Sequence, residues 1–241
     1  MADAPANSRA QFEDAARRLI DVAIAGVVLV AFLPVFGVVA VAIKLDSSGP
    51  VFFRCRRVGL QGEEFGMLKF RKMRGNASGV PLTVADDTRF TRIGGWLAKS
   101  KVDEFPQFWN VLRGEMSLVG PRPEDHSFVV QCRDRYAEVL RVKPGITGLC
   151  QLAFANEGEI LDPEDRVRDY VERLLPQKAA LDCFYVAHRS LVMDLRILTW
   201  TVIAVVLRRD VAVNRTTARL RVRRRPKARA HTVPTDEGLK A

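Results

Sequence analysis

Two adjacent carboxylates, Asp103 and Glu104, are the residues of this sequence best suited to chemistry. They lie in the cation-rich stretch KSKVDEFPQFWNVLRGEMSLVGPRPE, residues 99–124. Adjacent residues of a helix do not face each other, so the two acids can take different roles, and chemistry that needs two carboxyl groups in contact is disfavoured. We therefore predict that one carboxylate attacks a phosphorus atom while the other binds a metal ion.

Attack on phosphorus by a carboxylate requires that the charge of the phosphate be neutralised, which Mg²⁺ and basic side chains can do. Pro121 and Pro123 restrict the backbone of Arg122, as suits a guanidinium that must hold a phosphate in a fixed position. Further cations occur upstream of the arginine. The candidates for phosphate neutralisation are Lys69, Arg71, Lys99, Lys101 and Arg122.

A structural role for the acids is the alternative. Apolar residues at helical spacing predict a helix from Glu104 to Arg113, with Pro106 in its first turn, where a proline is tolerated. Asp103 then lies at or next to the N-cap, where a carboxylate stabilises a helix by ~0.3–1 kcal/mol. Capping would account for one of the two acids, but it explains neither the second acid nor the cations.

The first of the upstream cations fall on a predicted β-hairpin. Residues 51–57 (VFFRCRR) and 64–73 (EFGMLKFRKM) have the composition of strands, and residues 59–62 supply a turn between them. Side chains alternate along a strand, so Lys69 and Arg71 should share one face while Phe70 lies on the other. A solvated basic strand face is the alternative to a phosphate-binding one.

An uncharged segment precedes this hairpin, from Val22 to Ile43. It reaches the length of about 20 apolar residues that is needed to cross the hydrocarbon core of a bilayer. A cleaved signal peptide fits poorly, because its apolar region has about 7–15 residues and is followed by a small-residue cleavage site. The sequence therefore predicts a membrane anchor.

Pro34 interrupts this anchor and leaves its topology open. A proline inside a helix removes a backbone donor and clashes with the carbonyl four residues earlier, so the helix must kink or break. One alternative is a kinked spanning helix. The other is a re-entrant hairpin whose two arms, each shorter than ~20 residues, return to the cytoplasmic face. The backbone groups freed at the bend need partners in lipid, for which the apolar run Ile197–Leu207 is the candidate.

Charge and cysteine content bear on partners and location. The net charge of +10 is concentrated from Arg208 onward, where eleven Lys or Arg face three acidic residues. Such a tail attracts either nucleic acid or an anionic membrane surface, and its position directly after an apolar run favours the membrane. The four cysteines are scattered without a C-x-x-C pair, which indicates reduced thiols in the cytosol rather than a zinc site or a disulfide framework.

From about Arg17 to Leu207 the chain resembles the bacterial sugar transferase family, the monotopic phosphoglycosyl transferases that begin glycan assembly on a polyprenyl phosphate. The resemblance is carried by an ordered set of motifs: RLID at 18–21, KLDSSGPVFFR, KFRKM, the acid-pair segment, KPGITGL, LDCFYV and SLVMDLRIL. The short chain implies the minimal catalytic form of the family.

The resemblance implies an α+β, mainly helical fold with a re-entrant N-terminal membrane helix-hairpin, a short β-hairpin and a compact cytoplasmic catalytic domain with interfacial helices. We accordingly divide the chain into four parts. These are an N-terminal segment (1–16), a re-entrant membrane anchor (17–45), a catalytic domain (46–207) and a basic, disordered tail (208–241).

The resemblance also implies roles for individual residues. By this similarity Asp103 is the nucleophile, Glu104 helps to bind Mg²⁺, and Pro34 breaks the re-entrant anchor. Ala98 stands where a basic residue is common in the family, so Lys99 is expected to substitute for it. The positions expected to bind substrate are Lys69, Arg71, Lys99, Arg122, Asp182 and Tyr185.

In the implied reaction, Asp103 attacks a UDP-sugar, releases UMP and passes the phosphosugar to undecaprenyl phosphate, which initiates exopolysaccharide, O-antigen or glycoconjugate assembly. The implied location is the bacterial inner membrane, with the catalytic domain on its cytoplasmic face. Expected partners are membrane lipids, downstream glycosyltransferases and a second copy of the chain, but no nucleic acid. The alternative is a membrane-tethered polyanion-binding or scaffold protein without catalysis.

Overall fold

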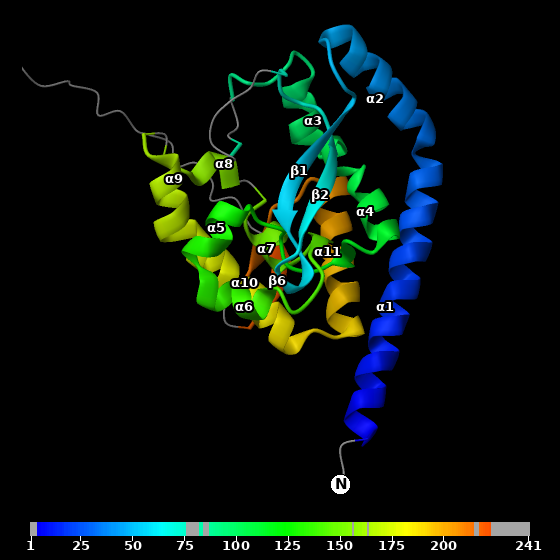
Figure 1. The fold of residues 1–241 in the computed structure, drawn as a ribbon, viewed down its shortest axis with the longest axis vertical. Helices are drawn as coiled ribbons and strands as arrows, with labels where there is room; N and C mark the ends of the chain where they lie inside the picture. The colour runs from blue at the N-terminus through cyan, green and yellow to red at the C-terminus, as the bar shows by residue number, and fades with distance from the viewer. Residues whose placement is uncertain are drawn as a thin grey trace, which may run out of the picture.

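The computed structural model describes residues 4–75, 82–83, 87–155, 157–162, 164–214 and 217–222 (Figure 1). Within these residues helices predominate, and the strands form three separate two-stranded sheets. The expected α+β, mainly helical class is therefore confirmed.

Two helices form the N-terminal part of the structure, α1 (Ala4–Ala31) and α2 (Leu33–Asp46). Pro34 lies in the first turn of α2, where a missing backbone donor is tolerated, and the helix breaks just before it at Phe32. The two helices are bent by 59°, and Figure 1 shows α1 along one side of the molecule with α2 turning toward α3. Among the described residues no single helix has the length and apolarity to cross a membrane, but this bent pair has both when taken together.

The bend between α1 and α2 contacts the segment that follows the acid pair. The ring centroid of Phe32 lies 4.7 Å from that of Phe105. Leu33 is 63% exposed, and Val202 in the middle of the C-terminal apolar run is exposed as well. The expected burial of the bend against Ile197–Leu207 is therefore wrong, because Leu33 stays largely exposed and the aromatic contact of Phe32 is with the acid-pair segment.

Charged residues of α1 bind two segments that follow the acid pair in the sequence. Arg18 donates hydrogen bonds at 2.6 and 2.8 Å to two last-turn carbonyls of α4 (Gln107–Arg113). Asp21, one turn further along α1, accepts from the backbone amide of Leu118 at 2.9 Å, in β3 (Ser117–Val119). The RLID motif thus ties the anchor to the end of one element and to the start of the next.

The predicted β-hairpin is present. β1 (Phe52–Val58) and β2 (Glu64–Phe70) pair antiparallel around the short turn η1 (Leu60–Gly62). At the open end of the hairpin Phe70 is buried while Lys69 lies on the other face, as the alternation predicts.

A small apolar cluster joins the hairpin to the anchor. Phe70 packs with Val39 and Ile43 of α2 and with Leu97 of α3 (Gly94–Ser100). These side chains are almost completely buried. The end of β2 is therefore fixed by apolar packing directly beside the basic residues of the hairpin.

The acid pair lies in a single 3-10 turn, η2 (Val102–Glu104), between α3 and α4. Lys101 enters this turn in a left-handed conformation, with φ of 60°. Pro106 directly precedes the first residue of α4, and no side chain caps this helix. The N-cap role expected for Asp103 is therefore wrong, because the helix begins only at Gln107.

A short parallel sheet supports the Pro-Arg-Pro segment. β3 pairs with β4 (Gly145–Thr147), and the Gly145 amide also donates to the carbonyl of Pro121 at 2.8 Å. A Cβ on Gly145 would lie 2.1 Å from the amide nitrogen of Gly120, so the backbones approach too closely for any side chain. The KPGITGL motif thus serves to seat the segment that carries Arg122.

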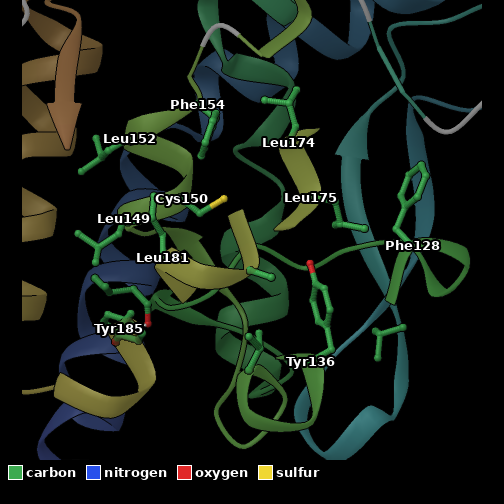
Figure 2. Close-up of a cluster of buried hydrophobic side chains, with 14 of the residues drawn as sticks. Phe128, Tyr136, Leu149, Cys150, Leu152, Phe154, Leu174, Leu175, Leu181 and Tyr185 are labelled. Carbon is green, nitrogen blue, oxygen red and sulfur yellow. Dashed lines mark hydrogen bonds between the residues drawn. The ribbon is translucent and has the colours of Figure 1, made fainter. Parts of the chain in front are cut away.

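The second half of the chain forms the helical body and most of the main core. α10 (Leu175–His188) packs against α6 (Arg133–Val139) and α7 (Leu149–Ala153). Figure 2 shows Tyr136 and Cys150 among the side chains that gather there. The other helical elements of this half are α5 (His126–Gln131), α8 (Glu157–Ile160), α9 (Arg166–Asp169), the π-helical turn η3 (Tyr170–Leu174) and α11 (Leu191–Val206).

The chain keeps regular structure beyond Arg208. β5 (Val211–Val213) and β6 (Leu220–Val222) pair antiparallel, and Val211 is buried in the main core, where β5 packs on α7. The disordered tail expected from residue 208 onward is therefore wrong over these strands, whose short apolar runs are masked in the sequence by the surrounding arginines. Residues 223–241 of that predicted tail lie outside the described residues.

Candidate active site

Each of the two acids contacts its own lysine from the end of the hairpin. Lys69 Nζ donates to Glu104 Oε1 at 2.8 Å. Lys72 Nζ lies 2.8 Å from Asp103 Oδ2, in an ion pair without the alignment of a hydrogen bond. The side chain of Asp103 is 1% exposed, whereas that of Glu104 is 24% exposed. The two carboxylates therefore have separate partners and different access to solvent, as their adjacency predicts.

Asn110 sets the position of β2 relative to the acid pair. Its Oδ1 accepts from the amide of Leu68 at 2.9 Å, and its Nδ2 donates to the carbonyl of Gly66 at 2.9 Å. This buried amide thus takes the place of a neighbouring strand along the free edge of β2. Because Asn110 lies in the first turn of α4, shortly after the turn that holds the acids, this contact brings Lys69 alongside Glu104.

The charges around Glu104 keep it ionised. Burial alone would raise the pKa of this carboxyl group, but the cations of Lys69, Arg122 and Lys101 hold it well below its usual range. Glu104 is therefore available as an anionic ligand at neutral pH. The structure thus brings Glu104, Lys69 and Arg122 into one electrostatic cluster.

Arg122 lies between the acid pair and a second group of carboxylates. Its Nε is 3.9 Å from Glu124 Oε1. Burial acts to lower the pKa of this guanidinium, but Glu157, Glu124 and Glu104 together raise it above its ordinary value. Arg122 is therefore a permanent cation whose side chain is still partly open to solvent.

The second group is a buried ion cluster centred on Lys178, whose side chain is 1% exposed. The ammonium donates to Glu124 Oε1 at 2.7 Å and to Glu157 Oε2 at 2.9 Å. The hydroxyl of Tyr170 also donates to Glu124, at 2.8 Å. Burial disfavours both charges, yet the pairing keeps the pKa of Glu124 below and that of Lys178 above their ordinary values.

Asp182 lies one helical turn after Lys178 on α10, and it is also fully buried. Neither of its oxygens forms a well-aligned hydrogen bond among the residues that the structure describes, although the backbone amide of Arg122 is close enough to act on its pKa. Burial raises the pKa of Asp182 well above its ordinary range, and the cations of Lys178 and Arg122 oppose this only in part. The predicted substrate residue Asp182 therefore lies near Arg122, but its side chain is closed off from solvent.

Arg71 is committed to the end of the anchor instead of to the acids. Its guanidinium donates to the carbonyl of Ser47 at 2.7 Å and to the carbonyl of Ser48, in the turn after α2. The residue is buried, so these contacts fix the hairpin to the anchor. These contacts use the two terminal nitrogens of the guanidinium, whereas Nε has no hydrogen-bond partner among the described residues, and the substrate contact of Arg71 stays a prediction.

Tyr185 likewise joins helices. Its hydroxyl donates to Asp194 Oδ1 at 2.7 Å, and Asp194 Oδ2 accepts from Arg17 Nε at 2.7 Å. These contacts connect α10, α11 and α1 in a buried network, which accounts for Tyr185 without any substrate. Lys99, the remaining predicted cation, is exposed on α3 and forms no ion pair within the described part of the chain.

A comparison with protein-family models decides the relationship that the motifs suggest. The model described as bacterial sugar transferase matches residues 12–208, well over half of the chain. The chain belongs to the bacterial sugar transferase family.

Similar proteins carry names that agree with this family. A UDP-glucose:undecaprenyl-phosphate glucose-1-phosphate transferase of Xanthomonas campestris pv. campestris is 38% identical over 197 residues, which cover 79% of this chain and 38% of that protein. A protein of the same name from Caulobacter vibrioides is 39% identical over 194 residues, or 78% and 69% of the two chains. The exopolysaccharide production protein PSS of Rhizobium leguminosarum bv. phaseoli is 38% identical over 189 residues, or 73% and 88%. The match thus spans well under half of the Xanthomonas protein and most of the other two.

In this sugar transferase, sequence reasoning missed two of the cations that matter to the site. Continued alternation would put Lys72 on the same face as Phe70, but the strand ends at Phe70, two residues before Lys72, so the alternation does not place this lysine. The role of Lys178 could have been found from the sequence. A lysine four residues before Asp182 in an otherwise apolar helix indicates a buried charge that needs a partner.

Proposed function

We propose that this sugar transferase moves a phosphosugar from a UDP-sugar to undecaprenyl phosphate through a covalent acyl-phosphate intermediate on Asp103. The observation that carries this proposal is the separation of the two acids, with Asp103 buried on Lys72 and Glu104 accessible on Lys69. One carboxylate is thereby suited to bond formation and the other to a cation. The names of the similar proteins, which pair UDP-glucose with undecaprenyl phosphate, support the two substrates.

The proposed reaction has two steps. In the first, an oxygen of Asp103 forms a bond to the phosphorus that carries the sugar, and the bond from that phosphorus to UMP breaks. In the second, a phosphate oxygen of undecaprenyl phosphate bonds to the same phosphorus, and the bond to Asp103 breaks. The products are UMP and a lipid diphosphosugar, and the carboxylate is restored for the next cycle.

Lys69 and Arg122 neutralise the diphosphate in this proposal. Both already lower the pKa of Glu104, so their positive field covers the space beside the acid pair. The partly exposed fork of Arg122 suits bidentate contact with a phosphate, and the field of the three glutamates keeps it charged. Their main effect is expected on the binding of the UDP-sugar.

Glu104 is the residue that would hold Mg²⁺. Only Oε1 of its carboxylate has a hydrogen-bond partner in the described part of the chain, and the side chain is accessible. The described residues contain no group of three His, Cys, Asp or Glu side chains that could hold a metal ion by themselves. Such a site fits Mg²⁺, because this ion is commonly held by one or two carboxylates together with substrate phosphates and water. When bound, Mg²⁺ would stabilise the negative charge that develops on the departing UMP.

We further propose that α1 and α2 form a re-entrant anchor at the bacterial inner membrane, with the transferase domain on the cytoplasmic face. The 59° bend and the exposed apolar residues on both helices, among them Val27 and Val38, support this topology. A cysteine introduced at Ala2 in a cysteine-free background should resist a membrane-impermeant thiol reagent in intact cells. Labelling of that thiol would indicate a spanning helix instead.

The similarity to a protein named for exopolysaccharide production supports a role at the start of such an assembly, ahead of downstream glycosyltransferases. Partners in this role are the membrane lipids and the lipid acceptor. A polyanion-binding or scaffold function without catalysis is the competing account, and it predicts no consumption of any nucleotide sugar.

A panel of UDP-sugars tests the proposed function directly. Protein in nanodiscs, supplied with undecaprenyl phosphate and Mg²⁺, should release UMP from at least one donor. Chelation by EDTA should stop the release, and excess Mg²⁺ should restore it, because the metal is expected to bind through a single protein carboxylate and to exchange readily. Release of no UMP from any donor, by protein that still binds anionic vesicles, would favour the scaffold account.

A further inference from the structure

Lys72 contacts Asp103 directly, yet the two proposed steps assign no role to this lysine. The lysine side chain is 20% exposed, against 1% for Asp103. Oδ2 of the carboxylate is buried without a hydrogen-bond partner among the described residues, and the ammonium of Lys72 makes its closest approach to this oxygen and not to Oδ1. One oxygen of the carboxylate is thus held and the other is left for a new bond.

The backbone of Lys72 is itself held in place. Its carbonyl accepts from the amide of Thr91 at 3.0 Å, and the next residue, Met73, forms an antiparallel bridge with Phe90. Gly94 packs so closely that a Cβ there would lie 1.9 Å from the carbonyl oxygen of Lys72. Gly94 begins α3, which leads into the turn with the acids, so the lysine and the carboxylate are tied to one short segment.

We propose that Lys72 is the positioning residue of the nucleophile, which holds Oδ2 of Asp103 so that Oδ1 is aimed at the phosphorus of the UDP-sugar. This inference rests on the proposed function and deepens it. Lys72 differs from Lys69 and Arg122, because its contact is with the attacking group and not with the surroundings of Glu104.

The expected consequence is a loss of rate without a loss of donor binding. A misplacement of about 1 Å at a reacting atom can cost about 10²-fold in rate. Since Lys72 acts through Asp103, its removal leaves the groups that bind the diphosphate unchanged. A residue that bound the donor equally in the ground and transition states would instead raise KM at constant kcat.

The experiment compares wild type, Lys72→Met, Lys72→Arg and Lys69→Met in nanodiscs with UDP-sugar and no lipid acceptor. We expect Lys72→Met to slow the single-turnover release of UMP about 10²-fold, with the concentration of donor at half-maximal rate nearly unchanged. Lys72→Arg should recover most of the rate, because it restores a cation beside Oδ2. Lys69→Met should mainly raise the concentration of donor at half-maximal rate. Arg133→Met, at an exposed position on α6, is the matched control and should behave as wild type.

Thermal unfolding provides a readout that does not depend on activity. Lys72→Met should lower the melting temperature in the wild-type background, where it leaves the buried Asp103 without its cation, but it should have little effect in an Asp103→Asn background. A loss of rate that Lys72→Arg does not rescue, or a rise in the required donor concentration at constant maximal rate, would overturn the inference. If wild type releases UMP and Lys72→Met matches it, only this inference fails; if wild type releases none, the proposed function fails with it.

Discussion

Asp103→Asn should abolish UMP release while the protein stays folded. The amide has nearly the shape of the carboxylate, but it carries no negative charge and cannot form the proposed bond to phosphorus. Removal of one partner from a buried ion pair costs about 3–5 kcal/mol when the other charge is left buried and unpaired. Here the charge left behind belongs to Lys72, which is 20% exposed and can be hydrated, so we expect a much smaller cost. The measurements are UMP release and the melting temperature of the same preparation.

Asp134→Asn is the matched control for this substitution. Asp134 is an exposed carboxylate in the first turn of α6, so its replacement should leave UMP release unchanged. An Asp103→Asn protein that turns over at the rate of the Asp134→Asn protein would rule out Asp103 as the nucleophile. The site would then have to be rebuilt around Glu104.

Lys178→Met should destabilise the protein strongly, on the order of 3–5 kcal/mol, because it leaves Glu124 as a buried charge without its main partner. For a protein of this size that corresponds to a fall in melting temperature on the order of 10 °C. UMP release should fall as well, since Glu124 also lies beside Arg122. A calorimetric or fluorescence melting curve in nanodiscs measures the effect.

Two further variants separate the ion cluster from a general effect of losing a cation. Arg168→Met breaks an exposed pair with Glu172 on the surface, where such pairs contribute little to stability, so its melting temperature should hardly change. Adding Glu124→Gln to Lys178→Met removes the stranded charge and should restore part of the stability. Equal melting temperatures for Lys178→Met and Arg168→Met would contradict the assignment of a stabilising cluster.

The local features of the candidate site could be predicted where short-range geometry decides them. The different partners of Asp103 and Glu104 follow from their adjacency, because side chains one residue apart diverge in any helical turn. The hairpin that carries Lys69 follows from strand composition around a turn. The break before α2 follows from the geometry of Pro34.

The predictions that were wrong or incomplete concern features that depend on tertiary contacts, which no local sequence pattern contains. Arg71 and Lys72 differ by one position, yet the first binds the turn after α2 and the second binds Asp103, because the chain leaves the strand at Phe70. The apolar spacing predicts that the helix starts at Glu104, whereas α4 begins at Gln107. The difference arises because η2 and Pro106 form a separate turn before the helix.

The wrong predictions for the C-terminal tail and for the packing of the anchor bend have a similar origin. The high charge after residue 208 conceals β5, which is short and is stabilised mainly by burial of Val211 against the main core. Packing of Phe32 on Phe105, in place of the expected contact with the C-terminal apolar run, joins segments far apart in sequence. Such contacts bring the anchor to the residue that follows the acid pair, and only the folded chain reveals them.

The central claim is that Asp103 carries the phosphosugar, and intact-peptide mass spectrometry tests it most directly. Wild-type protein is incubated with a competent UDP-sugar and Mg²⁺ in the absence of lipid acceptor, quenched and digested. The account predicts an added phosphosugar on the peptide that contains Asp103, its disappearance on addition of undecaprenyl phosphate, and no such adduct in Asp103→Asn. An adduct on another residue, or continued UMP release with no covalent adduct at any time, would contradict it.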